Sequence, residues 1–241
     1  MKHNFIISIF LGAFFSLQSQ DNQTLFNHAN QLVTEKKYNQ AINLYEKISV
    51  KNFAIFYNLA IAYAAENKFA QALVAIKRAE KVGNYGQLTD LYAFFDCFKK
   101  SINPEYELTF SNQVQLFIKK CILTTPILLL QILLFLIIAL LFLLWFLHLH
   151  RKYIKKYKVL LVLAVLVFTT YKYKEYLVQE KIGIVMVQSA NVFAGPDASF
   201  YVKNTLPGMT EVIIIQSNNG YKQIQVGNMI GWIYHQDIIE I

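Results

Sequence analysis

The side chains best suited to catalysis or metal binding are few and scattered. The chain has five histidines and two cysteines: His3, His28, His148, His150, His235, Cys97 and Cys121. His148 and His150 are two residues apart, so on a helix they lie on different faces and do not make a metal pair. The sequence contains no P-loop, no G-x-G-x-x-G and no C-x-x-C motif. We therefore expect no enzymatic activity, no cofactor and no metal site.

Composition and charge place the chain among membrane proteins. Its 241 residues are 55% hydrophobic and 16% charged, with a mean hydropathy of +0.33 and a formal net charge of +8. Two cysteines are too few for a disulfide framework. Residues 151–158 carry five basic side chains and no acidic one, and they lie between two apolar runs. Such a basic loop is typical of the cytoplasmic side of a membrane protein, so we expect the membrane, and no nucleic acid, as a partner.

Two apolar stretches predict two transmembrane helices. The first, residues 121–148, includes the 21 positions 127–147, in which Gln131 is the one polar residue. This length is enough to span a hydrocarbon core of about 30 Å. The second, residues 158–177, has a shorter apolar centre, and its flanking tyrosines and lysines can reach the interfaces. Residues 149–157 then form a basic cytoplasmic loop.

Residues 1–20 predict a secretory signal peptide. Lys2 precedes an apolar stretch at residues 5–15, and small and polar residues follow, with a plausible cleavage point near Ser19. The alternative is an uncleaved anchor, for which about 11 apolar residues are short. The signal peptide and the basic loop predict the same topology. In this topology the two spans place both soluble domains on the side of the membrane opposite the basic cytoplasmic loop.

Residues 21–120 predict a helical domain that contains a repeat. Residues 25–48 align with residues 56–79 at an offset of 31. Small and aromatic residues recur at matching positions: Ala29 and Ala60, Tyr38 and Phe69, Ala41 and Ala72. Each unit is expected to form two short helices around a polar turn, with a small residue where the helices touch. Residues 87–100 and 105–120 predict further helices that cap the stack, because two repeats alone bury too little surface.

This pattern resembles the tetratricopeptide repeat. In that family the first helix of each repeat lines a concave groove, which here would be neutral and partly aromatic. The resemblance assigns six positions to partner binding: Phe26, Asn27, Asn30, Tyr57, Asn58 and Ile61. Asn27 and Asn58 are equivalent, and an amide can pair with the extended backbone of a ligand. The other interpretation is that these are solvated residues of a purely structural stack.

Residues 182–241 change to a period of about two, which is typical of strands. Turn residues separate short β-branched runs, and five short strands are expected in a small barrel: the clearest runs are residues 182–187, 211–216, 221–226 and 229–234. Residues 191–197 are assigned to a connection between strands. Asn219-Gly220 is a strong signal for a tight hairpin.

The same region resembles a bacterial SH3 domain. The matching positions are Asn191-Val192, Gly195-Pro196, Gly208 and Gly231-Trp232-Ile233. Phe193 and Tyr221 stand where the family usually has Arg and Trp. The resemblance implies a ligand groove, for which the aromatic candidates are Phe193, Phe200, Tyr201, Tyr221, Trp232 and Tyr234. In a domain this small several of them must be core, and Trp232 is the one expected there.

Taken in order, these segments resemble the BatE family of the Bacteroides aerotolerance operon. The expected fold class is a multidomain membrane protein. It combines all-α tetratricopeptide hairpins, two transmembrane helices and a small all-β SH3-like barrel. The resemblance implies a non-enzymatic inner-membrane scaffold or adaptor with its interaction modules in the periplasm. The implied partners are membrane-anchored von Willebrand A-type Bat proteins, in a complex associated with a MoxR-type ATPase and linked to stress tolerance or envelope integrity.

Two other functions are compatible with the same segments. One is a cell-wall-tethering protein whose SH3-like domain binds peptidoglycan or its stem peptides. The other is a sensor that passes a periplasmic signal inward. The short predicted cytoplasmic loop, residues 149–157, weakens the sensor hypothesis because it offers little surface to a cytoplasmic partner.

Overall fold

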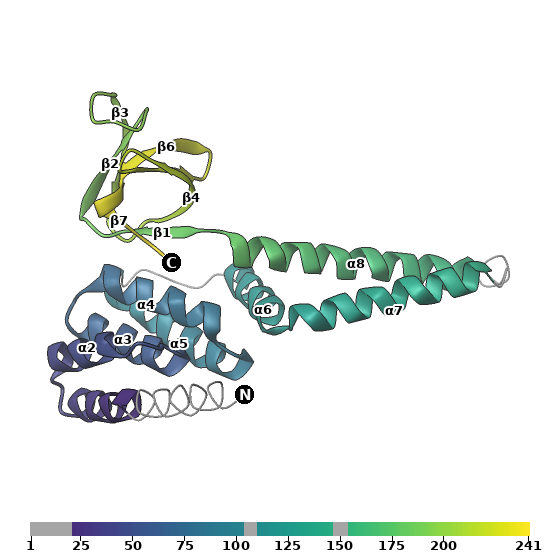
Figure 1. The fold of residues 1–241 in the computed structure, drawn as a ribbon, viewed down its shortest axis with the longest axis horizontal. Coiled ribbons are helices and arrows are strands. Elements are labelled where there is room, and N and C mark those ends of the chain that lie inside the picture. Colours follow the sequence, from purple (N-terminus) through teal and green to yellow (C-terminus); the bar gives the residue numbers. More distant parts are fainter. Residues whose placement is uncertain (1–20, 104–109, 147–153) are drawn as a thin grey trace, which may run out of the picture. The chain divides into compact units, whose positions relative to one another are not determined.

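The structure, a computed structural model, describes residues 21–103, 110–146 and 154–241. The predicted signal peptide lies outside the described residues, as does the larger part of the predicted basic loop. The chain divides into two compact units. The first contains the helices up to Gly83, a central part of the next helix and the β-sheet (Figure 1). The second contains the long helices between them.

Four helices of the first unit form two hairpins. The first hairpin pairs residues 21–34 with α2 (Tyr38–Lys47). The second pairs α3 (Phe53–Ala65) with α4 (Phe69–Val82). The side chain of Asn52 caps α3 by accepting a hydrogen bond from the backbone N–H of Ile55 at 3.1 Å.

The two hairpins turn in the same way, 31 residues apart. Lys36 and Asn67 have positive φ angles of 60° and 57°. The residues that follow, Lys37 and Lys68, each donate a backbone hydrogen bond to the carbonyl oxygen five positions back, at 2.8 and 2.9 Å. This is the Schellman arrangement, which satisfies the last carbonyl groups of a helix and reverses the chain within a few residues. The polar turns expected from the sequence therefore share one geometry.

Small residues lie where the helices of each hairpin meet. Ala29 and Ala60 in the first helices, and Ala41 and Ala72 in the second helices, are 0% exposed. Larger apolar side chains around them are also buried: Leu32, Ile42, Tyr45, Leu59, Leu73 and Ile76. A methyl group at the contact lets two helix backbones approach closely, so these four alanines set the spacing of the hairpins.

The next helix, α5 (Tyr85–Ile102), covers the predicted helix at residues 87–100 and is slightly longer. Asn84 and Gln87 form a capping box at its start, with both hydrogen bonds at 3.0 Å. Its apolar face is packed as expected: Leu88 and Leu91 are 0% exposed and Phe98 is 4% exposed. The helix ends one residue before Asn103, which precedes a proline and is therefore disfavoured in a helix.

Three long helices make up most of the second unit: α6 (Phe110–Thr124), α7 (Ile127–Phe146) and α8 (Ile154–Gln179). Pro126 separates α6 from α7 because it lacks the N–H that a continuous helix needs. The predicted first span, residues 121–148, therefore begins in α6, and its apolar part is α7. The end of the predicted loop, residues 154–157, belongs to α8. Within the described residues, one helix, α7, is long and apolar enough to cross a membrane.

Helices α7 and α8 pack against each other along one stripe. Leu130 and Ile137 of α7 and Val167 of α8 form a buried cluster, and partly buried neighbours extend it: Leu134, Leu141, Ala164 and Tyr171. The Nζ of Lys174, a side chain only 6% exposed, donates to the carbonyl oxygens of Leu123, at 2.7 Å, and of Thr125. A cation thus joins α8 to the last turn of α6 and to the residue that follows it, where carbonyl groups lack a donor from their own helix.

The region after Lys181 forms one antiparallel sheet in the order β3-β2-β6-β5-β4-β1-β7. Its strands are β1 (Ile182–Val185), β2 (Ser189–Phe193), β3 (Val202–Pro207), β4 (Glu211–Asn218), β5 (Tyr221–Val226), β6 (Met229–Tyr234) and β7 (Ile238–Glu240). All seven strands supply the buried core: Val185, Ala190, Val192, Leu206, Val212, Ile214, Ile224, Ile233 and Ile238. A flat sheet could not bring its edge strands to one cluster, so the sheet curls around the core (Figure 1).

The sheet differs from the sequence expectation in its number of strands and matches it at one hairpin turn. Seven strands replace the five expected, and the assignment of residues 191–197 wholly to a connection was wrong, because β2 extends through Phe193. Asn191 belongs to β2 because the residues on either side of it, Ala190 and Val192, pack into the core. The Asn219-Gly220 hairpin is confirmed: φ is 49° and 77°, both positive as a type I′ turn requires.

The packing of the hairpins generates the first prediction. Replacing Ala60, which is 0% exposed, with Leu adds volume where the helices touch. We expect the Ala60→Leu substitution to lower the free energy of unfolding by about 1–3 kcal/mol, because overpacking forces helices apart. Ala65→Leu, at the exposed end of α3, is the matched control and should change little. Thermal unfolding of the full chain followed by circular dichroism checks this, and equal melting of both variants would contradict it.

Candidate functional site

The six residues predicted for partner binding lie on two helices of the first unit. Residues 21–34 carry the first three and α3 carries the others: Phe26, Asn27 and Asn30, then Tyr57, Asn58 and Ile61. All are half-buried except Asn27, which is exposed. The Nδ2 of Asn58 donates to the Oδ1 of Asn30 at 2.9 Å, so the two helices meet at this face.

Asn30 is the centre of a small polar network. Its Oδ1 accepts hydrogen bonds from Asn58 and from the hydroxyl of Tyr45. Tyr45 is 0% exposed, and burial raises the pKa of its phenol, which keeps the hydroxyl protonated as a donor. Part of the hydrogen-bonding capacity of both amides is therefore used inside the protein, where it holds the first hairpin to α3.

Tyr57 lies in a row of aromatic rings. Its ring stacks on Phe53 and meets Phe94 of α5 edge-on, with centroids 5.7 Å apart in each case. Phe94 continues the row to Phe98 at 6.2 Å. Burial and the nearby carboxylate of Asp90 raise the pKa of Tyr57, so its hydroxyl is neutral at physiological pH. Tyr57 therefore presents a ring whose orientation is already fixed by its neighbours.

Three of the predicted aromatic residues of the sheet come together on β2, β5 and β6. The ring of Tyr221 meets Phe193 edge-on at 5.9 Å and lies 5.5 Å from Tyr234. His235 extends the row at 4.8 Å from Tyr234, and its Nδ1 lies 2.8 Å from the carbonyl oxygen of Gly220. A carbonyl oxygen only accepts, so Nδ1 carries the proton in this contact. We call Phe193, Tyr221, Tyr234 and His235 the aromatic strip.

The other aromatic candidates have different surroundings. Trp232 is 8% exposed, as expected for a core residue. Gly231 precedes it because a Cβ there would lie 2.3 Å from Cγ1 of Val192, which leaves no room for a side chain. Tyr201 and Phe200 are 70% and 47% exposed, in the segment between β2 and β3.

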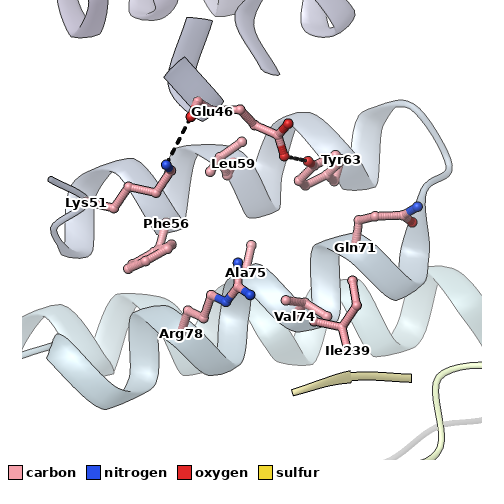
Figure 2. Close-up of a pocket in the computed structure, with 10 residues that line it drawn as sticks. All are labelled: Glu46, Lys51, Phe56, Leu59, Tyr63, Gln71, Val74, Ala75, Arg78 and Ile239. Carbon is pink, nitrogen blue, oxygen red and sulfur yellow. Dashed lines mark hydrogen bonds between the residues drawn. The ribbon is translucent and has the colours of Figure 1, made fainter. Parts of the chain in front are cut away.

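The structure also has a pocket of about 410 Å³, and none of the predicted positions lines it (Figure 2). Its lining residues come mainly from α3 and α4: Glu46, Lys51, Phe56, Leu59, Tyr63, Gln71, Val74, Ala75, Arg78 and Ile239. Gln71, Val74 and Arg78 recur on one face of α4 at a helical spacing. That spacing is visible in the sequence, but a packed core face produces the same pattern, so it could not identify a pocket.

The charged residues of the pocket are engaged to different degrees. Glu46 accepts a hydrogen bond from the hydroxyl of Tyr63, and burial together with this carboxylate raises the pKa of that tyrosine. The Nζ of Lys51 donates to the carbonyl oxygens of Glu46 and Ile48, at 3.1 and 2.8 Å. Arg78 is half-buried, and it forms no ion pair with any described residue.

The described part of the chain offers few groups for metal or thiol chemistry. No three His, Cys, Asp or Glu side chains of the described residues are grouped so that they could hold a metal ion. Cys97 and Cys121 are free thiols. His148 and His150 lie outside the described residues.

No protein-family model and no curated protein matches the chain. Among solved structures, a match to NlpC2 from Trichomonas vaginalis has 18% sequence identity and a TM-score of 0.25. The match covers 26% of this chain and 26% of that chain.

The polar network generates the second prediction. Removing the Asn30 amide leaves the hydroxyl of the buried Tyr45 without its acceptor. We expect Asn30→Ala to lower the free energy of unfolding by about 1–3 kcal/mol, the usual penalty for an unsatisfied buried donor. Asn27→Ala removes an exposed amide three residues away and should change stability by less than about 0.5 kcal/mol. Chemical denaturation of the two variants distinguishes these outcomes, and equal midpoints would show that the network does not stabilise the hairpins.

Proposed function

We propose that this chain is a non-enzymatic scaffold or adaptor of the bacterial inner membrane. Its helical hairpins act as tetratricopeptide-type modules and its curled sheet as an SH3-like barrel, both on the periplasmic side. The observation that carries the proposal is a large apolar surface on α7 and α8 that no other described residue covers. Its extent favours a membrane hairpin over a pair of solvated helices.

The apolar surface of α7 extends along the whole helix. Large side chains such as Leu128, Phe135 and Phe146 are 67%, 71% and 65% exposed. A helix of 20 residues is about 30 Å long, which equals the thickness of a bilayer's hydrocarbon core. Trp145, 56% exposed, lies near one end, where aromatic residues anchor membrane helices.

The central part of α8 has the same character, which supports a second span at residues 158–177. Its exposed apolar residues are Val159, Leu161, Val162, Leu163, Val165, Leu166 and Phe168. In water these side chains would form a continuous apolar patch with α7, far larger than soluble monomers usually expose. Lysines flank this stretch in the sequence, at Lys158 and Lys172, and long lysine side chains can reach the interface.

The helical hairpins supply the recognition surface in this proposal. Tyr57 offers a pre-oriented aromatic ring, and Asn27 offers an exposed amide on the neighbouring helix. Aromatic residues that are already held in place are favourable at interface hot spots. A partner anchored in the same membrane gains from effective concentration, so that weak contacts suffice. By resemblance to the BatE family, the partners are membrane-anchored von Willebrand A-type Bat proteins.

The topology of this proposal generates the third prediction. A periplasm-specific reporter enzyme fused after Ile241 should be active, whereas the same reporter fused at Lys155 should be inactive. The expected asymmetry follows from the basic residues 151–158, which stay on the cytoplasmic side. Reporter activity in intact cells, normalised to the amount of fusion protein, measures it. The reverse pattern would overturn the two-span topology.

Partner binding generates the fourth prediction. Co-expression with a von Willebrand A-type Bat protein, followed by co-purification, tests the face that carries Tyr57. We expect Tyr57→Ala to reduce partner recovery about tenfold or more, equivalent to at least about 1.4 kcal/mol of binding free energy. Asn27→Arg should also reduce it, because a bulky charge is added at an exposed position, where the amide oxygen accepts only an exposed hydrogen bond from Gln23 of the same helix among the described residues.

Two controls separate binding from folding in this experiment. Tyr234→Ala, in the aromatic strip, changes an aromatic residue on the sheet and should leave recovery unchanged. Circular dichroism should show unchanged helicity for Asn27→Arg. If that variant folds and retains the partner fully, the proposed face is wrong.

The aromatic strip favours a second candidate function, in which the SH3-like barrel tethers the protein to peptidoglycan or its stem peptides. Phe193 and Tyr221 are half-buried, whereas Tyr234, 36% exposed, and His235 are exposed, so the strip offers ring surface to a ligand. Retention of the solubilised protein on purified sacculi tests this function. Loss of retention in Tyr221→Ala and Tyr234→Ala variants would support it, and absence of retention by the unmodified chain would exclude it.

A further inference from the structure

The pocket on α3 and α4 contains a cation without an acidic partner among the described residues. Arg78 points into the space between the two helices, and Phe56, Val74 and Ala75 form an apolar wall beside it (Figure 2). The other charges of the pocket are engaged, since Glu46 accepts from Tyr63 and Lys51 donates to two backbone carbonyl groups. A guanidinium has five N–H donors in a fixed plane, an arrangement that matches a carboxylate.

We propose that this pocket binds an extended acidic segment of a protein partner, with one carboxylate side chain on Arg78 and an aliphatic side chain against Val74 and Phe56. This site is separate from the face that carries Tyr57 and therefore goes beyond the proposed scaffold function. The two predictions can fail independently, because they rest on different residues.

The spacing of the pocket residues selects an extended peptide. Val74 and Arg78 are one helical turn apart, which is about 6 Å along α4 at 1.5 Å per residue. In an extended chain, side chains two positions apart point the same way and are about 6.6 Å apart. An acidic residue on Arg78 therefore places an aliphatic residue two positions away beside Val74, which is 5% exposed and packs with Ile239 of β7 at the edge of the pocket. Gln71, a further turn along the same face, can donate to or accept from the peptide backbone.

The charge balance selects an acidic ligand. Lys51 and Arg78 outweigh the one carboxylate of the lining, Glu46, so the pocket has a net positive charge. A basic segment would leave Arg78 without a counter-charge and would add a second cation beside it. A purely apolar segment would cover the half-buried guanidinium without replacing its hydrogen bonds to water.

A display experiment on the full chain in lipid nanodiscs tests the proposal. Random peptides, flanked on both sides by constant linkers so that no chain end is presented, are selected against the unmodified protein. We expect enrichment of peptides with Asp or Glu two positions from Leu, Ile or Val. An enriched sequence is then synthesised with acetylated and amidated ends, and its affinity is measured by fluorescence anisotropy.

The affinity measurements decide the outcome. Replacing the acidic residue of the peptide, Asp with Asn or Glu with Gln, should weaken its binding to the unmodified protein at least tenfold. The Arg78→Gln variant should bind the original acidic peptide at least tenfold more weakly. Lys47→Gln, which removes an exposed positive charge at the end of α2, is the matched control and should change binding less than twofold. Arg78→Glu should bind the corresponding lysine peptide better than the acidic one, a reversal that misfolding cannot produce. Tyr57→Ala should leave peptide binding unchanged.

Several results would overturn the proposal. They are enrichment of peptides without an acidic residue, equal binding by Arg78→Gln and the unmodified chain, or no enrichment over a selection performed on Arg78→Gln. Failure of charge reversal in a folded Arg78→Glu variant would also exclude a direct contact between Arg78 and the carboxylate.

Discussion

The close approach of helix backbones at four buried alanines is the contact on which the helical hairpins depend. Ala29, Ala41, Ala60 and Ala72 are each fully buried, and each fills a position where a larger side chain would separate two helices. The polar network of Asn30, Tyr45 and Asn58 requires this spacing, because its hydrogen bonds join the first hairpin to α3. The pocket on α4 depends on it too, because its walls are the side chains that surround these contacts.

The periodic parts of the fold could be predicted because one interaction determines each of them. Alanines at matching positions predict helical hairpins, and the structure places all four at helix contacts. Asn219-Gly220 predicts a tight turn because both residues adopt positive φ more readily than others do. Strand β2 was missed because Ser189 and Asn191 are common in turns, whereas their strand conformation depends on pairing with β3, fifteen residues or so along the chain.

The candidate sites were predictable only in part, because a site depends on which residues distant in sequence become neighbours. Phe193 and Tyr221 were identified by type, and their edge-on contact arises from the pairing of β2 and β5 with β6. The structural role of Asn30 was not foreseen, since the sequence gives no indication that Tyr45 and Asn58 converge on it. The position of Arg78 in the lining of a pocket was not foreseen either, because a basic residue on a helix is ordinarily solvated.

The contact made by Lys174 affects the order in which the chain assembles. Its ammonium group satisfies carbonyl oxygens of Leu123 and Thr125, about 50 residues earlier in the chain. During synthesis, the carbonyl groups at the junction between α6 and α7 therefore lack these donors until α7 and most of α8 have been made. At about 5–20 residues per second, that interval is roughly 3–10 seconds. Until then the carbonyl groups beside Pro126 are open to water, and the junction closes only when α8 has returned alongside α7.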